Sequence, residues 1–192
     1  KASPGLVGEL PASQWWLGLH MWLWETGERL AASLALQWSW ATLRDGRLTF
    51  ALPAEGRKNG QPAVYQLDAE ASAVLLSLVP PPKPRKRSRK PAETTGPTLP
   101  AIPARGDVFA KPFGRARFYE LYHELLERAG VDRSGRPGPH QMRRSFASHL
   151  NAAAGAGAAR QALGHSSDAV PARYLDPRIA GGPPACDRLP KV

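Results

Sequence analysis

The sequence predicts a mainly α-helical α+β domain with a small antiparallel β-hairpin or sheet at one edge. Three observations lead to this fold class. Segments in which apolar residues recur at helical spacing outnumber segments with strand-like alternation. Two short alternating segments flank an Asn-Gly pair, which is typical of a hairpin. The chain has 192 residues, of which 42% are hydrophobic, enough for one core but not for two large domains.

The N-terminal part of the chain is expected to form two helices. A tryptophan-rich segment begins near Ser13, a candidate N-cap. Its residues at helical spacing are Leu17, Met21 and Trp24. All 6 tryptophans lie between residues 15 and 40, and we expect them to pack in the core. The Thr26–Gly27 pair ends the first helix, and a short second helix follows over residues 29–36.

The β-structure is predicted for the middle of the chain. Asp45–Gly46 is a turn signal ahead of a strand over residues 47–53. A second alternating segment covers residues 63–67. Because Asn59–Gly60 lies in the polar segment between them, we expect the two strands to pair as a hairpin.

Further helices are expected on both sides of a long irregular segment. Asp68 is a candidate N-cap for a helix over residues 70–78. An amphipathic helix is predicted for residues 116–130. Another is predicted for residues 140–154, followed by a short alanine-rich helix that begins at residue 158 and ends at Gly164. The apolar positions of the helix over 140–154 are Met142, Phe146 and Leu150.

Residues 80–105 interrupt this pattern, because prolines recur there without any helical or strand period. This composition predicts an extended or disordered insertion. Six of the eight residues at 83–90 are basic, and such a run attracts phosphates regardless of base sequence. The candidate contacts to a DNA backbone are Lys83, Arg85, Lys86, Arg87, Arg89, Lys90 and, farther along the chain, Arg144. The Gly- and Pro-rich tail from about residue 176 is expected to be loose.

The charge balance restricts the kind of partner. There are 26 basic and 16 acidic side chains, giving a net charge of +10. This excess favours a polyanion, above all a nucleic acid, although a basic tail that only aids solubility is the alternative. The single cysteine, Cys186, excludes an internal disulfide and a cysteine-based zinc site. No apolar run is long enough to cross a membrane, and the first residues show no signal-peptide pattern.

Four short motifs follow one another along the chain in a fixed order. They are TGER at 26–29, RKNG at 57–60, HQMR at 140–143 and LGH at 163–165, with Tyr174 nine residues after the last histidine. Together these motifs resemble the catalytic core of the tyrosine recombinases, the phage integrase family. The resemblance covers about residues 16–179 apart from the proline-rich insertion, and the nine-residue spacing from His165 to the tyrosine is part of it.

The resemblance implies a set of catalytic residues and their roles. The set consists of Arg29, Lys58, His140, Arg143, His165 and Tyr174. Tyr174 would be the nucleophile that attacks a DNA phosphodiester and forms a covalent 3′-phosphotyrosine. The two arginines would hold the phosphoryl oxygens, to which His165 would also donate. Lys58 would act as general acid on the leaving oxygen and His140 as base near the nucleophile, with no metal or nucleotide cofactor.

The resemblance also implies a domain organisation and partners. Residues 1–192 would form one catalytic domain, and the N-terminal core-binding domain of the family would be absent from this chain. Because the chain opens with Lys1 and not Met, we expect it to be part of a longer protein. That protein would act on double-stranded DNA as a tetramer and would not bind a membrane. It would lie in the cytoplasm, associated with the nucleoid, and its gene would belong to a bacterium, a phage or another mobile element.

The sequence departs from the family pattern at several places. The family often has an acidic residue three positions after the first arginine, but here that position is Ala32, which puts local packing in doubt. The segment between His149 and His165 is one residue short and rich in Ala and Gly. The insertion is longer than the usual connection, and the tail has no amphipathic helix of the kind that family members exchange between subunits.

Two other functions remain open from the sequence. One is a type IB topoisomerase-like enzyme that nicks and closes DNA with the same covalent tyrosine chemistry. The other is a catalytically silent DNA-binding module. The spacing from the Leu-Gly-His motif to Tyr174 favours a recombinase over the first, and the presence of all six catalytic residues argues against the second.

Overall fold

The computed structural model describes residues 5–8, 10–55, 57–80, 101–111, 113–132 and 138–164. The helices are α1 (Ala12–Thr26), α2 (Leu30–Leu34), α3 (Ala69–Leu76), α4 (Arg115–Arg128) and α5 (Pro139–Leu163), with a 3₁₀ turn at Trp38–Trp40. The strands are β1 (Leu6–Val7), β2 (Leu10–Pro11), β3 (Ala41–Arg44), β4 (Arg47–Leu52) and β5 (Ala63–Gln66). His165, Tyr174, the basic run at 83–90 and the tail from residue 176 lie outside the described residues.

The described part of the chain confirms the predicted fold class. The strands β3, β4 and β5 form one antiparallel sheet in that order, and β4 and β5 are the predicted hairpin. The sheet has a third strand, β3, for which the sequence had indicated no separate segment. It joins β4 through Asp45 and Gly46, which have φ values of 50° and 74°. A two-residue loop with both φ positive matches the right-handed twist of the strands that it connects, so this turn sets the register of β3 on β4.

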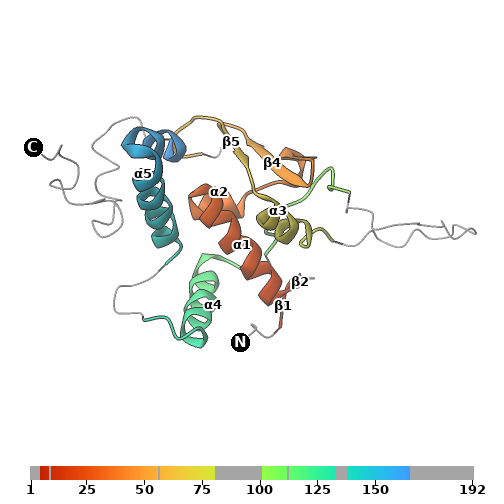
Figure 1. The fold of residues 1–192 in the computed structure, drawn as a ribbon. Coiled ribbons are helices and arrows are strands. Elements are labelled where there is room, and N and C mark those ends of the chain that lie inside the picture. The colour runs from red at the N-terminus through yellow and green to blue at the C-terminus, as the bar shows by residue number, and fades with distance from the viewer. Residues whose placement is uncertain are drawn as a thin grey trace, which may run out of the picture.

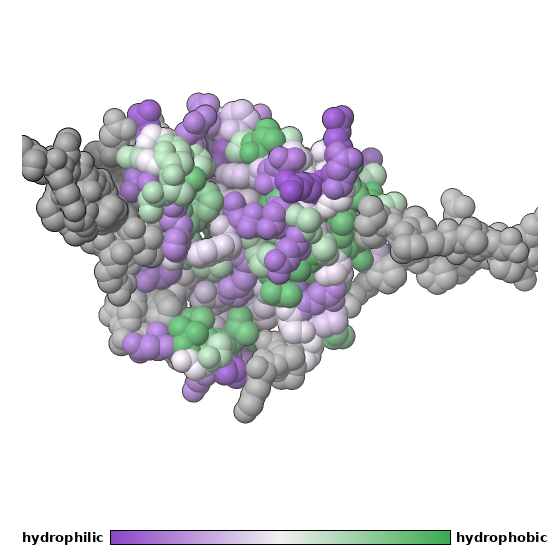
Figure 2. Space-filling view, viewed as in Figure 1, coloured by the Kyte–Doolittle hydropathy of each residue, from purple (hydrophilic) through white to green (hydrophobic). Residues whose placement is uncertain are grey.

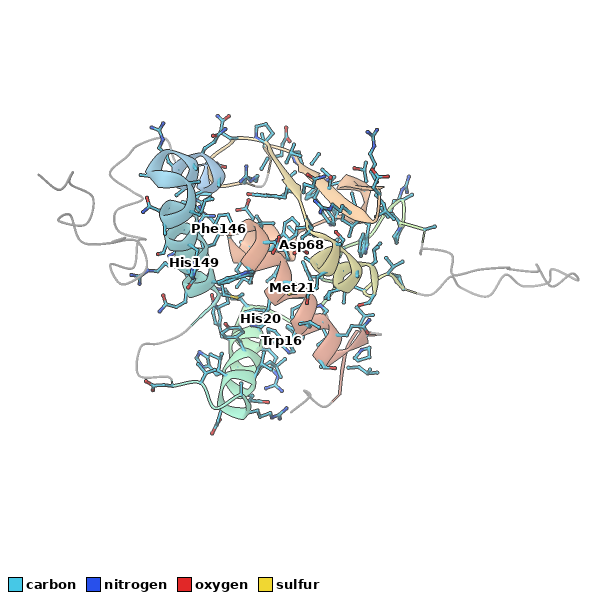
Figure 3. The ribbon with its side chains drawn as sticks, in the orientation of Figure 1. Trp16, His20, Met21, Asp68, Phe146 and His149 are labelled. Atoms are coloured by element: carbon cyan, nitrogen blue, oxygen red, sulfur yellow. The ribbon has the colours of Figure 1, made fainter. Side chains whose placement is uncertain are left out.

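Helix α1 is the centre of the domain, with α3, α4 and α5 arranged around it (Figure 1). Trp16 packs against the ring of Tyr122 on α4, with centroids 5.7 Å apart. On another side, Trp22 packs edge-on against Phe50 of β4, with centroids 5.2 Å apart. Figure 3 shows Phe146 and His149 of α5 facing the C-terminal half of α1, and Trp16 and His20 facing α4. One helix therefore fixes the positions of the sheet and of both C-terminal helices.

The tryptophan-rich segment is largely core, as expected, but its buried face differs from the predicted one. Trp15, Trp22 and Trp38 are completely buried. Leu17 and Trp24, two of the three residues expected on the apolar side, are exposed instead. Because nearly every residue of this segment is apolar, helical spacing alone could not tell which side faces the core.

The predicted caps have mixed outcomes. Asp68 does cap α3, since its carboxylate accepts a hydrogen bond of 2.7 Å from the Ala71 amide. Ser13 is not an N-cap, because α1 begins at Ala12 with Pro11 in the cap position. The β1–β2 ribbon brings the chain to Pro11 in an extended conformation, so the helix begins two residues earlier than the serine suggested.

Helix α5 combines the two helices that the sequence predicted near the C-terminus. Gly155, with φ 85° and ψ 168°, is not helical and separates the two parts. The buried residues of the first part are Pro139, Arg143, Ala147 and Ser148, whereas the expected Met142, Phe146 and Leu150 are half-buried. In the space-filling view, the alanine-rich part of α5 forms a pale, weakly hydrophobic surface (Figure 2). None of the described helices is long and apolar enough to span a membrane.

Gly27 provides a test of how tightly α1 is held to α5. Its φ is 58°, and a Cβ built there would overlap the ring of Phe146. We expect Gly27→Ala to lower the free energy of unfolding by about 2–5 kcal/mol, from left-handed strain plus overpacking. Gly46→Ala is the matched control, because Gly46 has φ 74° but open space around it. It should cost only about 1–2 kcal/mol. Chemical denaturation measures both values. Equal losses of unfolding free energy in the two variants would show that the Phe146 ring moves aside without cost.

Candidate active site

The first of the expected catalytic residues lies where α1 ends. Gly27 takes the left-handed conformation that terminates the helix, and its amide donates to the Leu23 carbonyl at 3.0 Å. The Thr26 hydroxyl accepts from the Glu28 amide at 3.2 Å and donates to the Trp22 carbonyl at 2.7 Å. This turn delivers Arg29 to the N-cap position of α2, with its side chain half-buried.

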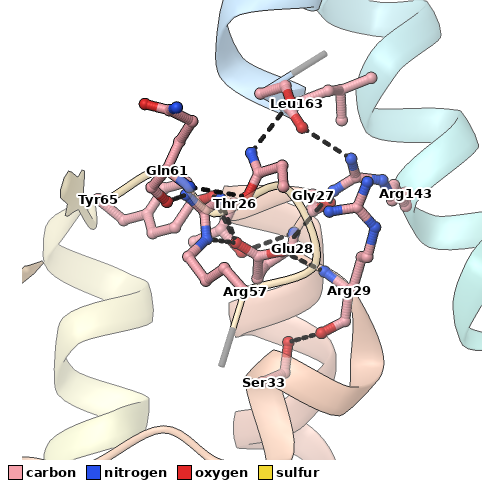
Figure 4. Close-up of polar contacts among 12 residues, drawn as sticks. Thr26, Gly27, Glu28, Arg29, Ser33, Arg57, Gln61, Tyr65, Arg143 and Leu163 are labelled. Atoms are coloured by element: carbon pink, nitrogen blue, oxygen red, sulfur yellow. Dashed lines mark hydrogen bonds and ion pairs between the residues drawn. The ribbon is translucent and has the colours of Figure 1, made fainter. Parts of the chain in front are cut away.

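Arg143 on α5 reaches into the same turn and is itself buried, with 2% of its surface exposed. One guanidinium nitrogen, Nη1, donates to the Gly27 carbonyl at 2.6 Å, and Nη2 donates to the Leu163 carbonyl at 2.9 Å. These two carbonyls come from the turn that carries Arg29 and from the end of the helix that precedes His165. Arg143 is therefore a fixed link between two of the predicted motifs (Figure 4).

His140 lies in the first turn of α5, one turn before Arg143. Burial and then the positive charges of Arg143, Arg144 and Arg29 lower the pKa of its imidazole. The same interactions show that these three guanidinium groups lie within electrostatic range of His140. Three of the predicted catalytic residues, which are up to 114 positions apart in sequence, thus meet in one basic region.

Lys58 lies in the loop between β4 and β5. The Gly60 amide donates to the Arg57 carbonyl at 3.0 Å, so residues 57–60 form a β-turn with Lys58 exposed at its second position. The next residue, Asn59, donates through Nδ2 to the Gly164 carbonyl at 3.0 Å. This contact brings the lysine-bearing turn against the residue that immediately precedes His165.

A buried polar cluster lies beneath these residues and was not predicted from the sequence. It consists of Glu28, Arg57 and Tyr65, which we call the Glu28 cluster. Arg57 donates to Glu28 Oε2 through Nε at 3.0 Å and Nη2 at 2.7 Å. The Tyr65 hydroxyl donates to the same oxygen at 2.8 Å. Glu28 is 1% exposed and Arg57 is 8% exposed, so this ion pair is shielded from water.

The other oxygen of Glu28 faces the arginines. Oε1 accepts from the Arg29 amide at 2.7 Å and lies 3.9 Å from Arg143 Nη1. Burial by itself opposes ionisation of Glu28, but the Arg29 amide, the Tyr65 hydroxyl and Arg57 outweigh it and lower its pKa. Burial and the nearby carboxylate raise the pKa of Tyr65. The cluster is therefore an ionised carboxylate paired with Arg57 beside a neutral tyrosine.

The cluster also explains the departure at Ala32. This residue is half-buried and lines a small cavity of about 40 Å³ together with Arg57. The carboxylate that meets Arg57 comes from Glu28, which precedes Arg29 rather than following it. The signal in the sequence was the pair of unassigned charges directly next to two predicted catalytic residues, Glu28 before Arg29 and Arg57 before Lys58.

The described residues hold only part of the expected site. Arg29, His140 and Arg143 lie in one region, and the turn that carries Lys58 contacts the residue before His165, while His165 and Tyr174 lie outside the described residues. Arg144 is exposed on α5 beside this region. The arrangement can bind an oxyanion, because two guanidinium groups lie together there and the Glu28 carboxylate is paired with Arg57.

The stability of the cluster should depend on pH. Because the folded-state pKa of Glu28 lies below its usual value of 4.5, its contribution to stability is present above that pH and is lost as the pH falls through the lower folded-state value. Glu28→Gln should lower the free energy of unfolding at pH 7 by about 3–5 kcal/mol and flatten this acid-side decline. Denaturation at a series of pH values measures the loss at pH 7 and the decline on the acid side. The control is Glu55→Gln, which changes an exposed carboxylate in the same way. An unchanged decline in Glu28→Gln would contradict the assignment.

Comparisons with known proteins agree with this geometry. The model of the "Phage integrase family" matches residues 9–179. Among curated proteins, no single sequence matches significantly. The fold is similar to that of the XerH site-specific recombinase bound to difH substrate in a pre-cleavage complex, with a TM-score of 0.57 and 20% identity over 85% of this chain. In a post-cleavage complex of XerH with palindromic difH, the TM-score is 0.56 with 21% identity over 82% of this chain.

The structure of the Tn1549 transposon integrase with circular intermediate DNA is also similar, with a TM-score of 0.54 and 13% identity over 88% of this chain. The chain spans 43% and 40% of the two XerH chains and 56% of the transposon integrase chain. The family match extends from before α1 to beyond Tyr174 and so includes all four motifs. The chain belongs to the phage integrase family of tyrosine recombinases and has the fold of their catalytic domain.

Proposed function

We propose that this chain is the catalytic domain of a site-specific DNA recombinase or integrase. It cleaves and rejoins DNA strands through a covalent 3′-phosphotyrosine. The observation that carries the proposal is that Arg29, His140 and Arg143 lie in one basic region at the turn after α1, with the turn that bears Lys58 bound beside it through Asn59. The family match over residues 9–179 supports it, and so do relatives of the same fold that are described in complex with their DNA substrates.

The two arginines would bind the phosphoryl oxygens of the scissile phosphate. Negative charge grows on these oxygens as the tyrosine attacks, and guanidinium groups remain charged at every working pH. Arg143 is held by the carbonyls of Gly27 and Leu163, so little reorganisation is needed when the phosphate binds. An orientation that is fixed in advance is the main way in which such groups accelerate a reaction.

Proton transfer would involve His140 and Lys58. The tyrosine hydroxyl gives its proton to neutral His140 as its oxygen bonds to phosphorus. The bond from phosphorus to the 5′ oxygen breaks, and Lys58 gives that oxygen a proton. Burial and then the positive charges beside His140 lower its pKa and favour its neutral form, which is the form that can accept a proton. No metal and no nucleotide enters these steps, since the phosphotyrosine bond conserves the energy for rejoining.

Tyr174 is proposed as the nucleophile, and the other tyrosines have structural contacts of their own. Tyr65 is bound within the Glu28 cluster. Tyr122 is buried and stacks against His20 with centroids 5.7 Å apart, and Tyr119 packs on Phe118 in the same helix. These rings fix Tyr122 in the contact between α4 and α1, and neither tyrosine of α4 has the nine-residue spacing to a preceding histidine that Tyr174 has.

The proposed partner is double-stranded DNA, and strand exchange in the full-length protein would require a tetramer on it. The net charge of +10 favours contact with the phosphate backbone. The basic residues at 83–90 and Arg144 are the proposed backbone contacts outside the catalytic set. Such contacts give affinity without choosing a base sequence.

Covalent trapping tests the proposed function directly. A pool of random-sequence duplexes, each with a nick close to one fixed phosphate, lets the cleaved fragment diffuse away so that rejoining fails. We expect the wild-type chain to form protein–DNA adducts that survive denaturing electrophoresis, and Tyr174→Phe to form none. The substitution removes only the attacking oxygen, so the melting temperature and DNA affinity should not change.

The outcomes of this trapping separate the three possible functions. No adduct from the wild-type chain at high protein concentration would support a silent binding module and overturn the proposal. An adduct that persists in Tyr174→Phe would place the nucleophile elsewhere. Relaxation of supercoiled plasmid without any exchange between two copies of a trapped site would favour the topoisomerase-like enzyme. Sequencing the trapped DNA also supplies a substrate for the experiments below.

The pH dependence of trapping tests the role of His140. Because burial and the nearby arginines lower its pKa from 6.5, the midpoint of the fall in the rate of adduct formation should lie below pH 6.5. Arg144→Gln removes one of the charges that lower this pKa, so the midpoint of the fall should move upward. Single-turnover rates at saturating DNA over a series of pH values give this midpoint. Arg44→Gln, on the distant strand β3, is the control and should leave the midpoint unchanged. A midpoint that stays fixed would exclude His140 as the group that titrates.

A further inference from the structure

We propose that Arg57 is a positioning residue that holds Lys58 in place for proton transfer, through its buried ion pair with Glu28. The inference rests on the proposed function, because it takes Lys58 as the general acid. Its basis is the alternation of side chains in the β4–β5 turn. Arg57 points inward and is 8% exposed, Lys58 is exposed, and Asn59 points back to the Gly164 carbonyl at 3.0 Å.

Arg57 fixes the turn on which Lys58 stands. The Arg57 Nη1 donates to the Gln61 carbonyl at 2.5 Å. This bond connects the first residue of the 57–60 turn to the residue that follows the turn. The Gly60 amide donates to the Arg57 carbonyl at 3.0 Å, so main chain and side chain of Arg57 brace the same turn. Lys58 is therefore attached to a backbone that is bound on both sides of it.

Arg57 also relates this turn to the phosphate-binding arginines. Glu28 Oε2 accepts from Arg57, while Oε1 accepts from the Arg29 amide at 2.7 Å and lies 3.9 Å from Arg143 Nη1. One carboxylate thus contacts the lysine-bearing turn and lies beside both Arg29 and Arg143, which we call the phosphate clamp. A proton donor must lie within hydrogen-bond reach of the leaving oxygen, so its distance from the clamp determines whether it can act.

The planar guanidinium is essential to this arrangement. Arg57 uses three nitrogens to contact three groups, the Glu28 carboxylate, the Gln61 carbonyl and the Tyr65 hydroxyl. A lysine at the same place would keep the charge beside Glu28 but could not direct two N–H groups of one rigid plane at Oε2 while also reaching the Gln61 carbonyl. Arg57→Lys should therefore preserve the ion pair in a looser form and allow the turn to shift.

A substrate whose leaving atom needs no proton tests this role. A duplex recovered by trapping is prepared with the bridging 5′ oxygen of the scissile phosphate, or with sulfur in its place. A thiolate leaves without protonation because a thiol is far more acidic than an alcohol. We expect Arg57→Lys to form adducts at least tenfold more slowly than wild type with the oxygen substrate, and within about threefold of wild type with the sulfur substrate.

Two further variants make the comparison complete. Lys58→Ala should form adducts slowly with the oxygen substrate and at nearly the wild-type rate with the sulfur substrate. This result would identify protonation of the leaving oxygen as the affected step. Arg47→Lys is the matched control, since it makes the same change on an exposed residue of β4 away from the site. It should behave as wild type on both substrates. Melting temperature and non-covalent DNA affinity are measured for every variant.

The results distinguish the inference from the proposed function. Equal slowing of Arg57→Lys on both substrates would overturn the inference, because the pair would then act on the phosphate clamp or on folding. Wild-type rates on both would overturn it as well, while adduct formation by the wild-type chain would still support the proposed function. If Arg57→Lys does not fold, Tyr65→Phe replaces it, because it removes two hydrogen bonds to the pair and neither charge. It should show the same selective loss, and equal rates on both substrates would contradict the inference.

Discussion

The ionised carboxylate of Glu28 is the interaction on which the arrangement of the site depends. It is buried where three segments meet, the turn after α1, the β4–β5 loop and helix α5. A buried charge costs several kcal/mol in desolvation, which only good geometry and full hydrogen bonding can offset. Glu28 has such partners in the Arg29 amide, Arg57 and Tyr65. Because displacing any one segment would leave this charge poorly paired, the cluster disfavours other arrangements of the three.

Burial of arginine serves a second purpose at Arg143. Its guanidinium donates to main-chain carbonyls at Gly27 and Leu163 rather than to a carboxylate at close range. Carbonyl oxygens satisfy donors without cancelling the positive charge, so Arg143 can still attract an anion. The left-handed Gly27 allows this approach, since any side chain there would meet Phe146. The ends of α1 and α5 are therefore part of the site as much as the residues that the motifs name.

The sequence predicted the fold class, the hairpin and the cap at Asp68, because each has a local signal, and it named Arg29, His140 and Arg143, which the fold places in one region, from motifs of fixed spacing. It did not predict the Glu28 cluster. Glu28 and Arg57 are separated by 29 positions and lie on different elements, and no local pattern links two such charges. The prediction of which face of α1 is buried was wrong for another reason. Its segment is apolar on almost every side, so the partners on α4 and the sheet decide which tryptophans are covered.

The pairing of Glu28 with Arg57 also determines the charge that the site presents to a phosphate. At 4 Å, two unit charges interact by about 4 kcal/mol where the effective dielectric constant is about 20. Glu28 lies 3.9 Å from Arg143, so an unpaired carboxylate there would compete with a phosphate for this arginine. Arg57 neutralises that carboxylate from the opposite side, through two bonds to its other oxygen. The charges of Arg29, Arg143 and Lys58 then remain for the anion, and the residue that fixes the lysine also preserves the electrostatic field of the clamp.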